Sequence, residues 1–217
     1  MTDIMNRNRE LKGWLLRERI PQGDGPHPLI LMLHGWTGDE DAMWVFASRL
    51  PSNAMLVAPR GLYPAPMGGF SWQPQMAKLW PWVDDFNPAV EALLELLTDE
   101  NFPQADFSQL RLLGFSQGAA LAFTFALTYP EQVRSFAGLS GFLPDGVQPL
   151  VNQLPLEGKN AFLAHGTQDQ LVPVARARQA AQLLGQAGAR VSYCEDDVGH
   201  KLSSSCFKGL KFFFARN

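Results

Sequence analysis

The sequence predicts an α/β fold: a mainly parallel sheet of about seven strands with helices on both faces. Short apolar runs alternate with longer segments of helical periodicity, and several runs, such as residues 29–33, are apolar throughout. Such runs are typical of strands covered on both faces, and strand–helix alternation is typical of a parallel sheet. No repeat or linker interrupts the 217 residues, so we expect residues 1–217 to form one domain.

The apolar pattern predicts the elements in chain order. Strands are expected over residues 13–20, 29–33, 54–58, 110–114, 135–139, 161–164 and 190–194. Helices are expected over residues 41–49, 88–98, 117–129, 173–187 and 204–214. In residues 88–98, for example, apolar side chains recur every three to four positions, as on one face of a helix.

Residues 60–83 fit neither period. They contain four prolines and several large apolar side chains, which exclude a long helix and a regular strand. Long loops inside compact domains are often functional, so the segment is either a flap over the sheet edge or a wall of an apolar substrate pocket. We favour the pocket wall, with a lining of Leu62, Met67, Phe70, Trp72, Phe142 and Leu171.

Charge and hydropathy exclude some functions. The net charge of −3 gives no electrostatic reason to expect nucleic acid as a partner. No apolar run approaches the ~20 residues of a membrane span, and the first ten residues are too polar for a secretory signal. We therefore expect a cytoplasmic protein, and a homodimer is compatible with the sequence.

The cysteines and histidines give no sign of a metal site. Cys194 and Cys206 are twelve residues apart with no C-x-x-C pair. We expect both to be free thiols in a reducing compartment, with a disulfide as the alternative. The four histidines are scattered, so no catalytic metal is expected.

Residues 114–118 read Gly-Phe-Ser-Gln-Gly, between an apolar run and an Ala-rich helical segment. This is the strand, sharp turn and helix of a nucleophile elbow. Glycine on both sides makes room for the strained turn. The context predicts that Ser116 is a catalytic nucleophile.

A serine nucleophile needs a base and an orienting acid. On this type of fold they follow the serine in the order acid, then histidine. Only His165 and His200 follow Ser116. His165 ends a predicted strand and is interpreted as structural, whereas His200 lies in a loop after the last strand, at the carboxyl edge where ligands bind.

Asp169 is the predicted orienting acid, because it follows the 161–164 strand and so emerges at the same edge. The alternatives are Asp196 and Asp197, which share the loop of His200, and Asp145, which follows an earlier strand. Asp169 could also act only as a helix cap or a turn residue.

An oxyanion needs backbone N–H donors. Gln117 follows the nucleophile at a helix start, where N–H groups lack helical partners. The second donor is expected in the loop after residues 29–33; we favour Trp36, with Thr37 as the alternative. His34 in that loop is interpreted as a residue that shapes it.

Seven short motifs occur in an order that resembles the phospholipase/carboxylesterase family of α/β hydrolases, which includes acyl-protein thioesterases. They lie at residues 33–35, 38–40, 58–61, 114–118, 139–144, 165–169 and 199–200. The resemblance implies an α/β-hydrolase fold, a triad of Ser116, Asp169 and His200, an oxyanion hole of Trp36 and Gln117, and no cofactor. It also implies a small ester or acyl substrate, and hydrolysis of carboxylic esters through an acyl-enzyme.

Two positions depart from the family pattern. Ala119 stands where many members have a second glycine, and Trp36 where many have a smaller side chain, which would narrow the pocket. Thioester hydrolysis and lysophospholipid hydrolysis with the same triad remain alternatives. A more remote alternative is an inactive hydrolase scaffold that binds a ligand.

Overall fold

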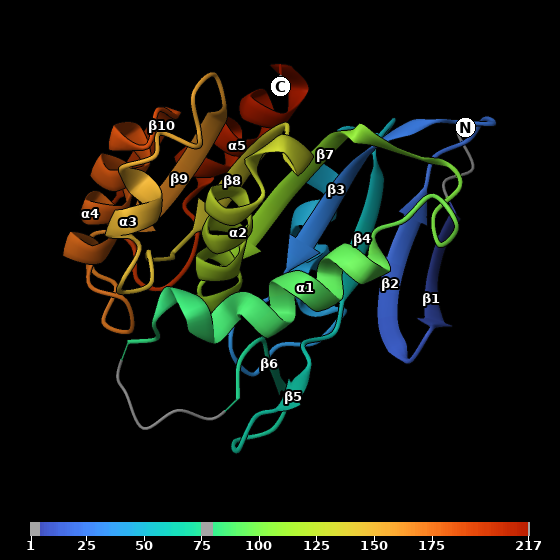
Figure 1. The fold of residues 1–217 in the computed structure, drawn as a ribbon, viewed down its shortest axis with the longest axis horizontal. Coiled ribbons are helices and arrows are strands. Elements are labelled where there is room, and N and C mark those ends of the chain that lie inside the picture. Colours follow the sequence, from blue (N-terminus) through green and yellow to red (C-terminus); the bar gives the residue numbers. More distant parts are fainter. Residues whose placement is uncertain (1–4, 75–79, 217) are drawn as a thin grey trace.

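The computed structural model describes residues 5–74 and 80–216, in which an eight-stranded sheet lies between two layers of helices (Figure 1). The strand order is β1–β2–β4–β3–β7–β8–β9–β10. β1 and β2 are antiparallel, as are β2 and β4, and every pair from β4 to β10 is parallel. The predicted α/β fold is confirmed.

The strands of the sheet are β1 (Met5–Leu11), β2 (Trp14–Ile20), β3 (His27–Leu33), β4 (Met55–Pro59), β7 (Ala105–Phe115), β8 (Ser135–Leu139), β9 (Asn160–Gly166) and β10 (Arg190–Asp196). The α-helices are α1 (Asn87–Leu96), α2 (Gln117–Thr128), α3 (Gln148–Val151), α4 (Val174–Gln186) and α5 (Ser204–Arg216). Short 3-10 helices are η1 (Ala42–Arg49), η2 (Val83–Phe86) and η3 (Pro130–Gln132).

The central strands bury side chains on both faces. Leu29, Leu31 and Leu33 of β3 belong to a core under α1, α2 and α4, whereas Ile30 and Met32 belong to a core under η1 and α5. This alternation follows from the period of two in a strand, and both layers are visible in Figure 1. α2 is buried along residues 117–127, which explains why its sequence is apolar all round.

Because β3, β4, β7, β8, β9 and β10 are parallel, their carboxyl ends lie along one edge of the sheet. In register, Leu33 of β3 pairs with Gly114 of β7, and Phe115 pairs with Leu139 of β8. The loops that follow these strands therefore meet at one edge, where an open α/β sheet binds ligands.

Three features of the fold were not predicted from the sequence. β1 has a polar, largely exposed sequence, so it carried no apolar signal, and the described sheet has eight strands where about seven were expected. Residues 42–49 form a 3-10 helix rather than the expected α-helix. α3 is only four residues long, too short for a periodic pattern.

Residues 60–74 fold back over the loop after β3. Tyr63–Pro64 (β5) and Phe70–Ser71 (β6) form a small antiparallel hairpin, and Phe70 makes a bridge with Gly38. Residues 75–79 of the segment 60–83 lie outside the described residues. No helix in the described ranges is long and apolar enough to cross a membrane.

Candidate active site

Ser116 lies at the turn between β7 and α2 with φ +54° and ψ −115°, a left-handed backbone that is unusual outside glycine. A Cβ on Gly114 would lie 2.1 Å from the Gly118 carbonyl oxygen, and a Cβ on Gly118 would lie 2.0 Å from the Leu33 oxygen. Neither position has room for a side chain, because the backbone of a neighbouring segment is too close. The Ser116 N–H donates to the Leu139 carbonyl of β8 at 2.8 Å, so the turn is fixed to the sheet as the elbow prediction expected.

His200 and Asp169 are brought together across the sheet edge. His200 Nδ1 lies 2.7 Å from Asp169 Oδ2, and the Asp169 side chain is fully buried. The other carboxylate oxygen accepts from the N–H groups of Leu171 and Val172, both at 2.9 Å. These bonds satisfy the buried carboxylate and orient the imidazole so that Nε2 is left for a substrate.

The His200 ring lies next to the elbow. Phe115, which directly precedes Ser116, meets the imidazole edge-on with 5.0 Å between ring centroids. Gly35 approaches the elbow from the β3 loop, where an added Cβ would lie 3.3 Å from the Ser116 Cβ. The three loops that follow β3, β7 and β10 thus converge around Ser116.

The loop after β3 presents one candidate oxyanion donor rather than two. Thr37 donates its N–H to the Phe70 carbonyl at 3.0 Å, so that N–H is already occupied. The Trp36 and Gln117 N–H groups have no hydrogen-bond partner among residues 5–74 and 80–216. This difference favours Trp36 over Thr37.

His34 shapes this loop through both ring nitrogens. Its Nδ1 donates to the Gly35 carbonyl at 2.7 Å, and its Nε2 accepts from the Gly61 N–H at 2.8 Å. Burial lowers the pKa of His34, which keeps the ring neutral and able to make both bonds. The interpretation of His34 as a loop-shaping residue agrees with these contacts.

An ion pair supports the same loop. Arg60 makes two 2.7 Å hydrogen bonds to the carboxylate of Glu40. The hydrogen bonds from Arg60 hold the pKa of Glu40 below its usual value. The pair joins the loops after β3 and β4, so it fixes the spacing of two neighbouring strand ends.

Trp72 is a support and not a pocket wall, contrary to our prediction. Its side chain is fully buried, and its Nε1 donates to the His34 carbonyl at 2.8 Å. The Gln117 side chain accepts from the Trp72 N–H at 3.1 Å and donates to Ser71 Oγ at 3.0 Å. These bonds join the segment after β6 to the elbow, a role that local sequence patterns could not indicate.

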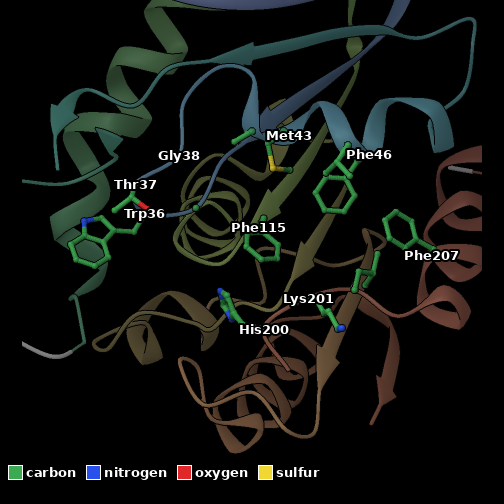
Figure 2. Close-up of a pocket in the computed structure, with 13 residues that line it drawn as sticks. Trp36, Thr37, Gly38, Met43, Phe46, Phe115, His200, Lys201 and Phe207 are labelled. Atoms are coloured by element: carbon green, nitrogen blue, oxygen red, sulfur yellow. The ribbon is translucent and has the colours of Figure 1, made fainter. Parts of the chain in front are cut away.

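A cavity of about 380 Å³ lies next to His200 (Figure 2). In Figure 2, Trp36 and Phe207 stand at opposite ends of the labelled group, with Phe115 between them. The lining is Gly35, Trp36, Thr37, Gly38, Ala42, Met43, Val45, Phe46, Phe115, His200, Lys201, Leu202 and Phe207. The cavity therefore lies between η1 and the start of α5.

None of the six residues predicted to line the pocket lines this cavity. Trp72 and Phe142 are buried, and Phe142 meets Trp80 edge-on in the core at 5.0 Å. Met67 and Leu171 are highly exposed, and Leu62 and Phe70 are partly buried. The full burial of Trp72 contradicts the prediction for that residue, because this part of residues 60–83 supports the oxyanion loop instead.

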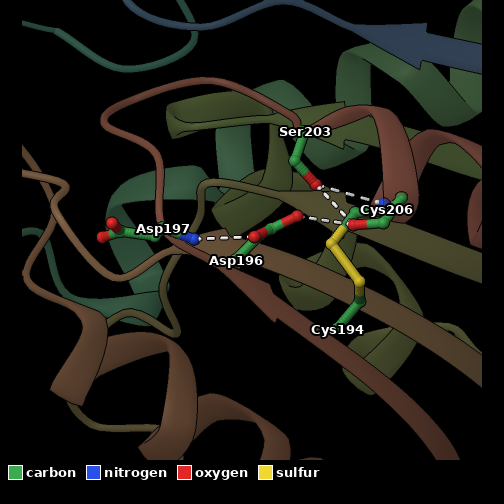
Figure 3. The surroundings of a disulfide bond; sticks show 6 residues. Cys194, Asp196, Asp197, Ser203 and Cys206 are labelled. Carbon is green, nitrogen blue, oxygen red and sulfur yellow. Dashed lines mark hydrogen bonds between the residues drawn. A yellow bond between two sulfur atoms is a disulfide. The ribbon is translucent and has the colours of Figure 1, made fainter.

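Cys194 and Cys206 form a disulfide, so the prediction of free thiols is wrong (Figure 3). Cys194 lies in β10 and Cys206 in the first turns of α5, and the intervening loop reverses the chain so that their Cα atoms are 5.8 Å apart. Twelve residues of separation carried no sign of this reversal. His200 lies inside the loop that the bond closes.

Backbone contacts also hold the His200 loop. Gln168 donates its N–H to the Val198 carbonyl at 3.0 Å, and Thr167 donates to Asp196 at 2.9 Å. Gly166 at the end of β9 permits this crossing, because an added Cβ would lie 2.1 Å from the Val198 oxygen. The position of His200 is thus set by β9 as well as by β10, the strand that precedes its loop.

The alternative acids have other partners. Asp145 pairs with Arg176 at 2.7 Å, Asp196 accepts from Ser205 at 2.5 Å, and Asp197 accepts from Thr167 at 3.2 Å. Only Asp169, among these four, reaches His200.

His165 is buried beneath the pair of His200 and Asp169. Its Nε2 lies 2.8 Å from the Val172 carbonyl and 3.3 Å from Asp169 Oδ2. Burial lowers the pKa of His165, so the neutral ring donates from Nε2 and supports the turn that carries Asp169. In the described parts of the chain, no three potential His, Cys, Asp or Glu metal ligands gather.

Comparison with known proteins identifies relatives of the chain. The sequence model of the phospholipase/carboxylesterase family matches residues 18–216. Acyl-protein thioesterase 1 of Eremothecium gossypii is 25% identical over 207 residues, which are 86% of each protein. The carboxylesterase SOBER1 of Arabidopsis thaliana is 30% identical over 108 residues, so the match spans about half of each chain (48% of this one, 47% of SOBER1).

A solved structure shows the same fold over nearly the full length. The carboxylesterase of Bacillus cereus superposes with a TM-score of 0.82 at 23% identity, covering 94% of this chain and 95% of that one. The chain therefore belongs to the phospholipase/carboxylesterase family, as the order of its motifs predicted.

Proposed function

We propose that the chain is a serine hydrolase that cleaves carboxylic esters through an acyl-enzyme. Ser116 is the nucleophile, His200 the general base and acid, and Asp169 the orienting acid. The N–H groups of Trp36 and Gln117 form the oxyanion hole. Membership of the phospholipase/carboxylesterase family supports the reaction class.

The proposed steps follow from these roles. His200 takes the proton of Ser116 Oγ as the oxygen attacks the ester carbonyl, and the oxyanion forms between the two N–H donors. His200 then returns the proton to the leaving oxygen and later activates a water molecule that hydrolyses the acyl-enzyme. Asp169, held by two N–H groups and bonded to Nδ1, keeps the imidazole in the tautomer that exposes Nε2.

One observation carries the proposal. Ser116 occupies a strained backbone position at a helix start, at the edge where the hydrogen-bonded pair of His200 and Asp169 lies. Strain of this kind is kept where the surroundings enforce it, and it is common at catalytic residues. Ser140 also has a left-handed backbone, so it is the combination of the strained turn with the neighbouring His200–Asp169 pair that singles out Ser116.

Labelling with a fluorophosphonate probe tests the proposal. We expect wild type to be labelled on Ser116, and Ser116→Ala to be unlabelled and inactive on a short p-nitrophenyl ester. Ser140→Ala is the control, because Ser140 also has a left-handed backbone next to a strand end but is fully buried, and it is expected to leave labelling intact. Equal labelling of wild type and Ser116→Ala would refute the mechanism.

Thioesters are the second candidate substrates, because the name of the Eremothecium relative is acyl-protein thioesterase. Lysophospholipids stay an alternative for the same triad. Matched oxygen esters and thioesters with the same acyl groups separate these substrates by kcat/KM. Turnover of any of them excludes an inactive ligand-binding scaffold.

The cytoplasmic location stays a prediction, and the disulfide opposes it, because such bonds are rare in the reducing cytosol. Alkylation of thiols in freshly lysed cells measures whether Cys194 and Cys206 are paired where the protein works. Homodimer formation and the absence of nucleic-acid binding stay predictions. Light scattering and a gel-shift measurement test them.

A further inference from the structure

We propose that the cavity between η1 and α5 holds the leaving group of the ester, and that this group is apolar near the ester bond and anionic at its far end. The inference rests on the proposed function, since it assigns a substrate part to the same active site. It differs from our expectation from the sequence, which placed the pocket along residues 60–83.

The position of the cavity relative to His200 assigns it to the leaving group. Asp169 is bonded to Nδ1 of His200, so Nε2 is the atom that returns a proton to the leaving oxygen. The cavity wall contains His200 and the two residues after it, Lys201 and Leu202. A leaving group that departs from Nε2 is therefore next to this wall.

The chemistry of the inner wall favours an apolar group. Met43, Phe46 and Phe115 face the cavity, and Phe46 and Phe207 lie with ring centroids 5.5 Å apart. The volume of about 380 Å³ lies within the range of roughly 300–1,000 Å³ that is usual for small-molecule sites. An alkyl or aryl alcohol gains burial here that methanol cannot.

The outer end of the site is cationic. Phe207 also lines a second hollow of about 180 Å³, whose other residues are Arg49, Ser204, Lys208 and Lys211. These three cations make no ion pair with any residue in the described ranges. Lys201, which is exposed, adds a further positive charge to the lining.

The apolar cavity and the cationic hollow share Phe207 in their linings. Together they fit an amphiphilic alcohol with an anionic end. Carboxylate and phosphate monoester share the chemistry that the three cations recognise. An unpaired exposed cation attracts either group, and the attraction weakens as salt is added.

The first experiment compares two ester series in wild type and in cavity variants. One series keeps a butyryl acyl group and lengthens an unbranched alcohol; the other keeps methanol and lengthens the acyl group. We expect kcat/KM to rise at least about tenfold along the alcohol series. Ala42→Trp, which fills the cavity, removes that rise; within each variant, kcat/KM for the longer alcohol esters is compared with kcat/KM for methyl butyrate.

Ser48→Trp is the matched control, because Ser48 is exposed on the same short helix and lines neither hollow. Val45→Trp is a second cavity variant at an exposed lining position, in case Ala42→Trp does not fold. If the cavity variants depress the acyl series and spare the alcohol series, the cavity holds the acyl chain and the proposal is wrong.

The second experiment tests the charge. With the acyl group and alcohol length fixed, the far end is a carboxylate, a phosphate monoester or a neutral amide. We expect the anionic esters to have a kcat/KM about fivefold above that of the amide at low salt. This preference is lost in the double variant Lys208→Gln/Lys211→Gln. It is kept in Arg190→Gln, a control on β10.

Preference for both anions supports a general anion site, and preference for phosphate alone narrows the class to phosphate monoesters. No preference in wild type overturns the anionic part of the proposal. Failure of this inference is distinguishable from failure of the proposed function. An enzyme that is labelled on Ser116 but indifferent to its alcohol contradicts only the leaving-group assignment.

Discussion

The two halves of the candidate active site are held in different ways. The half that carries Ser116 is fixed by backbone: glycines without room for a Cβ, a strained turn, and hydrogen bonds among β3, β7 and the β5–β6 hairpin. The half that carries His200 is a loop held by a covalent link and a few bonds to residues 166–169. The nucleophile half therefore depends on the fold itself, whereas the histidine half can be loosened while the sheet stays intact.

The largest expected effect is on the nucleophile half. Gly118→Ala places a methyl group 2.0 Å from the Leu33 oxygen, and we expect it to cost about 3 kcal/mol or more of unfolding free energy and to abolish activity. Gly185→Ala is the control, because an added Cβ meets nothing within 4 Å in α4, and it should stabilise by about 0.5–1 kcal/mol. Urea unfolding of both variants measures the difference. Similar stability of the two would contradict the requirement for glycine at 118.

The next effect is on the histidine half. Reduction of Cys194–Cys206 should lower the unfolding free energy by about 2–3 kcal/mol, as for loops of similar length. We also expect kcat/KM to fall about tenfold, because small displacements of a catalytic group are costly. Cys194→Ala/Cys206→Ala should show the same loss and no further response to reductant. A response of the double variant to reductant would show that the reagent acts elsewhere.

A smaller effect separates the backbone of Gln117 from its side chain. Gln117→Ala leaves the Trp72 N–H without its acceptor, at a cost of about 1–3 kcal/mol, but keeps the backbone N–H of the oxyanion hole. We expect kcat to fall only severalfold, whereas loss of an oxyanion donor costs about 100- to 1000-fold. A loss of that larger size would assign the Gln117 side chain to the reaction. Gln132→Ala, at an exposed position, is the control.

The smallest expected effect is that of the Glu40–Arg60 pair. Arg60 lowers the pKa of Glu40 in the folded protein. The ionised carboxylate therefore stabilises the fold fully at pH values above the pKa that Glu40 has in the unfolded chain. This stabilisation is lost as the pH falls through the lowered pKa of the folded state. Glu40→Gln should thus cost about 1–2 kcal/mol near neutral pH, and the difference from wild type should shrink below pH of about 4. Chemical unfolding at several pH values measures this. A difference that is constant with pH would mean that the carboxylate charge has no part in it.

The parts that could be predicted from sequence are those specified by local patterns. The apolar runs of β3, β7 and β8 located the core strands, and the glycines around Ser116 located the elbow. The position of Asp169 after β9 suggested the acid that the structure places beside His200. Each of these signals lies within a few residues of the feature it marks.

The parts that could not be predicted depend on contacts between distant segments. The polar edge strand β1 is held mainly by its pairing with β2, and Leu11 at its end adds an apolar contact with the core. Trp72 is buried because its indole reaches the His34 carbonyl, 38 residues away in sequence. The cavity exists because η1 and α5 come together on one face of the sheet, which no property of either segment alone indicates.

The disulfide has a topological consequence for the chain. Lys201 is exposed between the two cysteines, so a trypsin-like protease that cuts there opens the backbone without releasing α5. The two fragments stay joined through Cys194 and Cys206, and they separate on a gel only after reduction. A nicked molecule of this kind keeps its nucleophile half complete and carries His200 next to a new chain end.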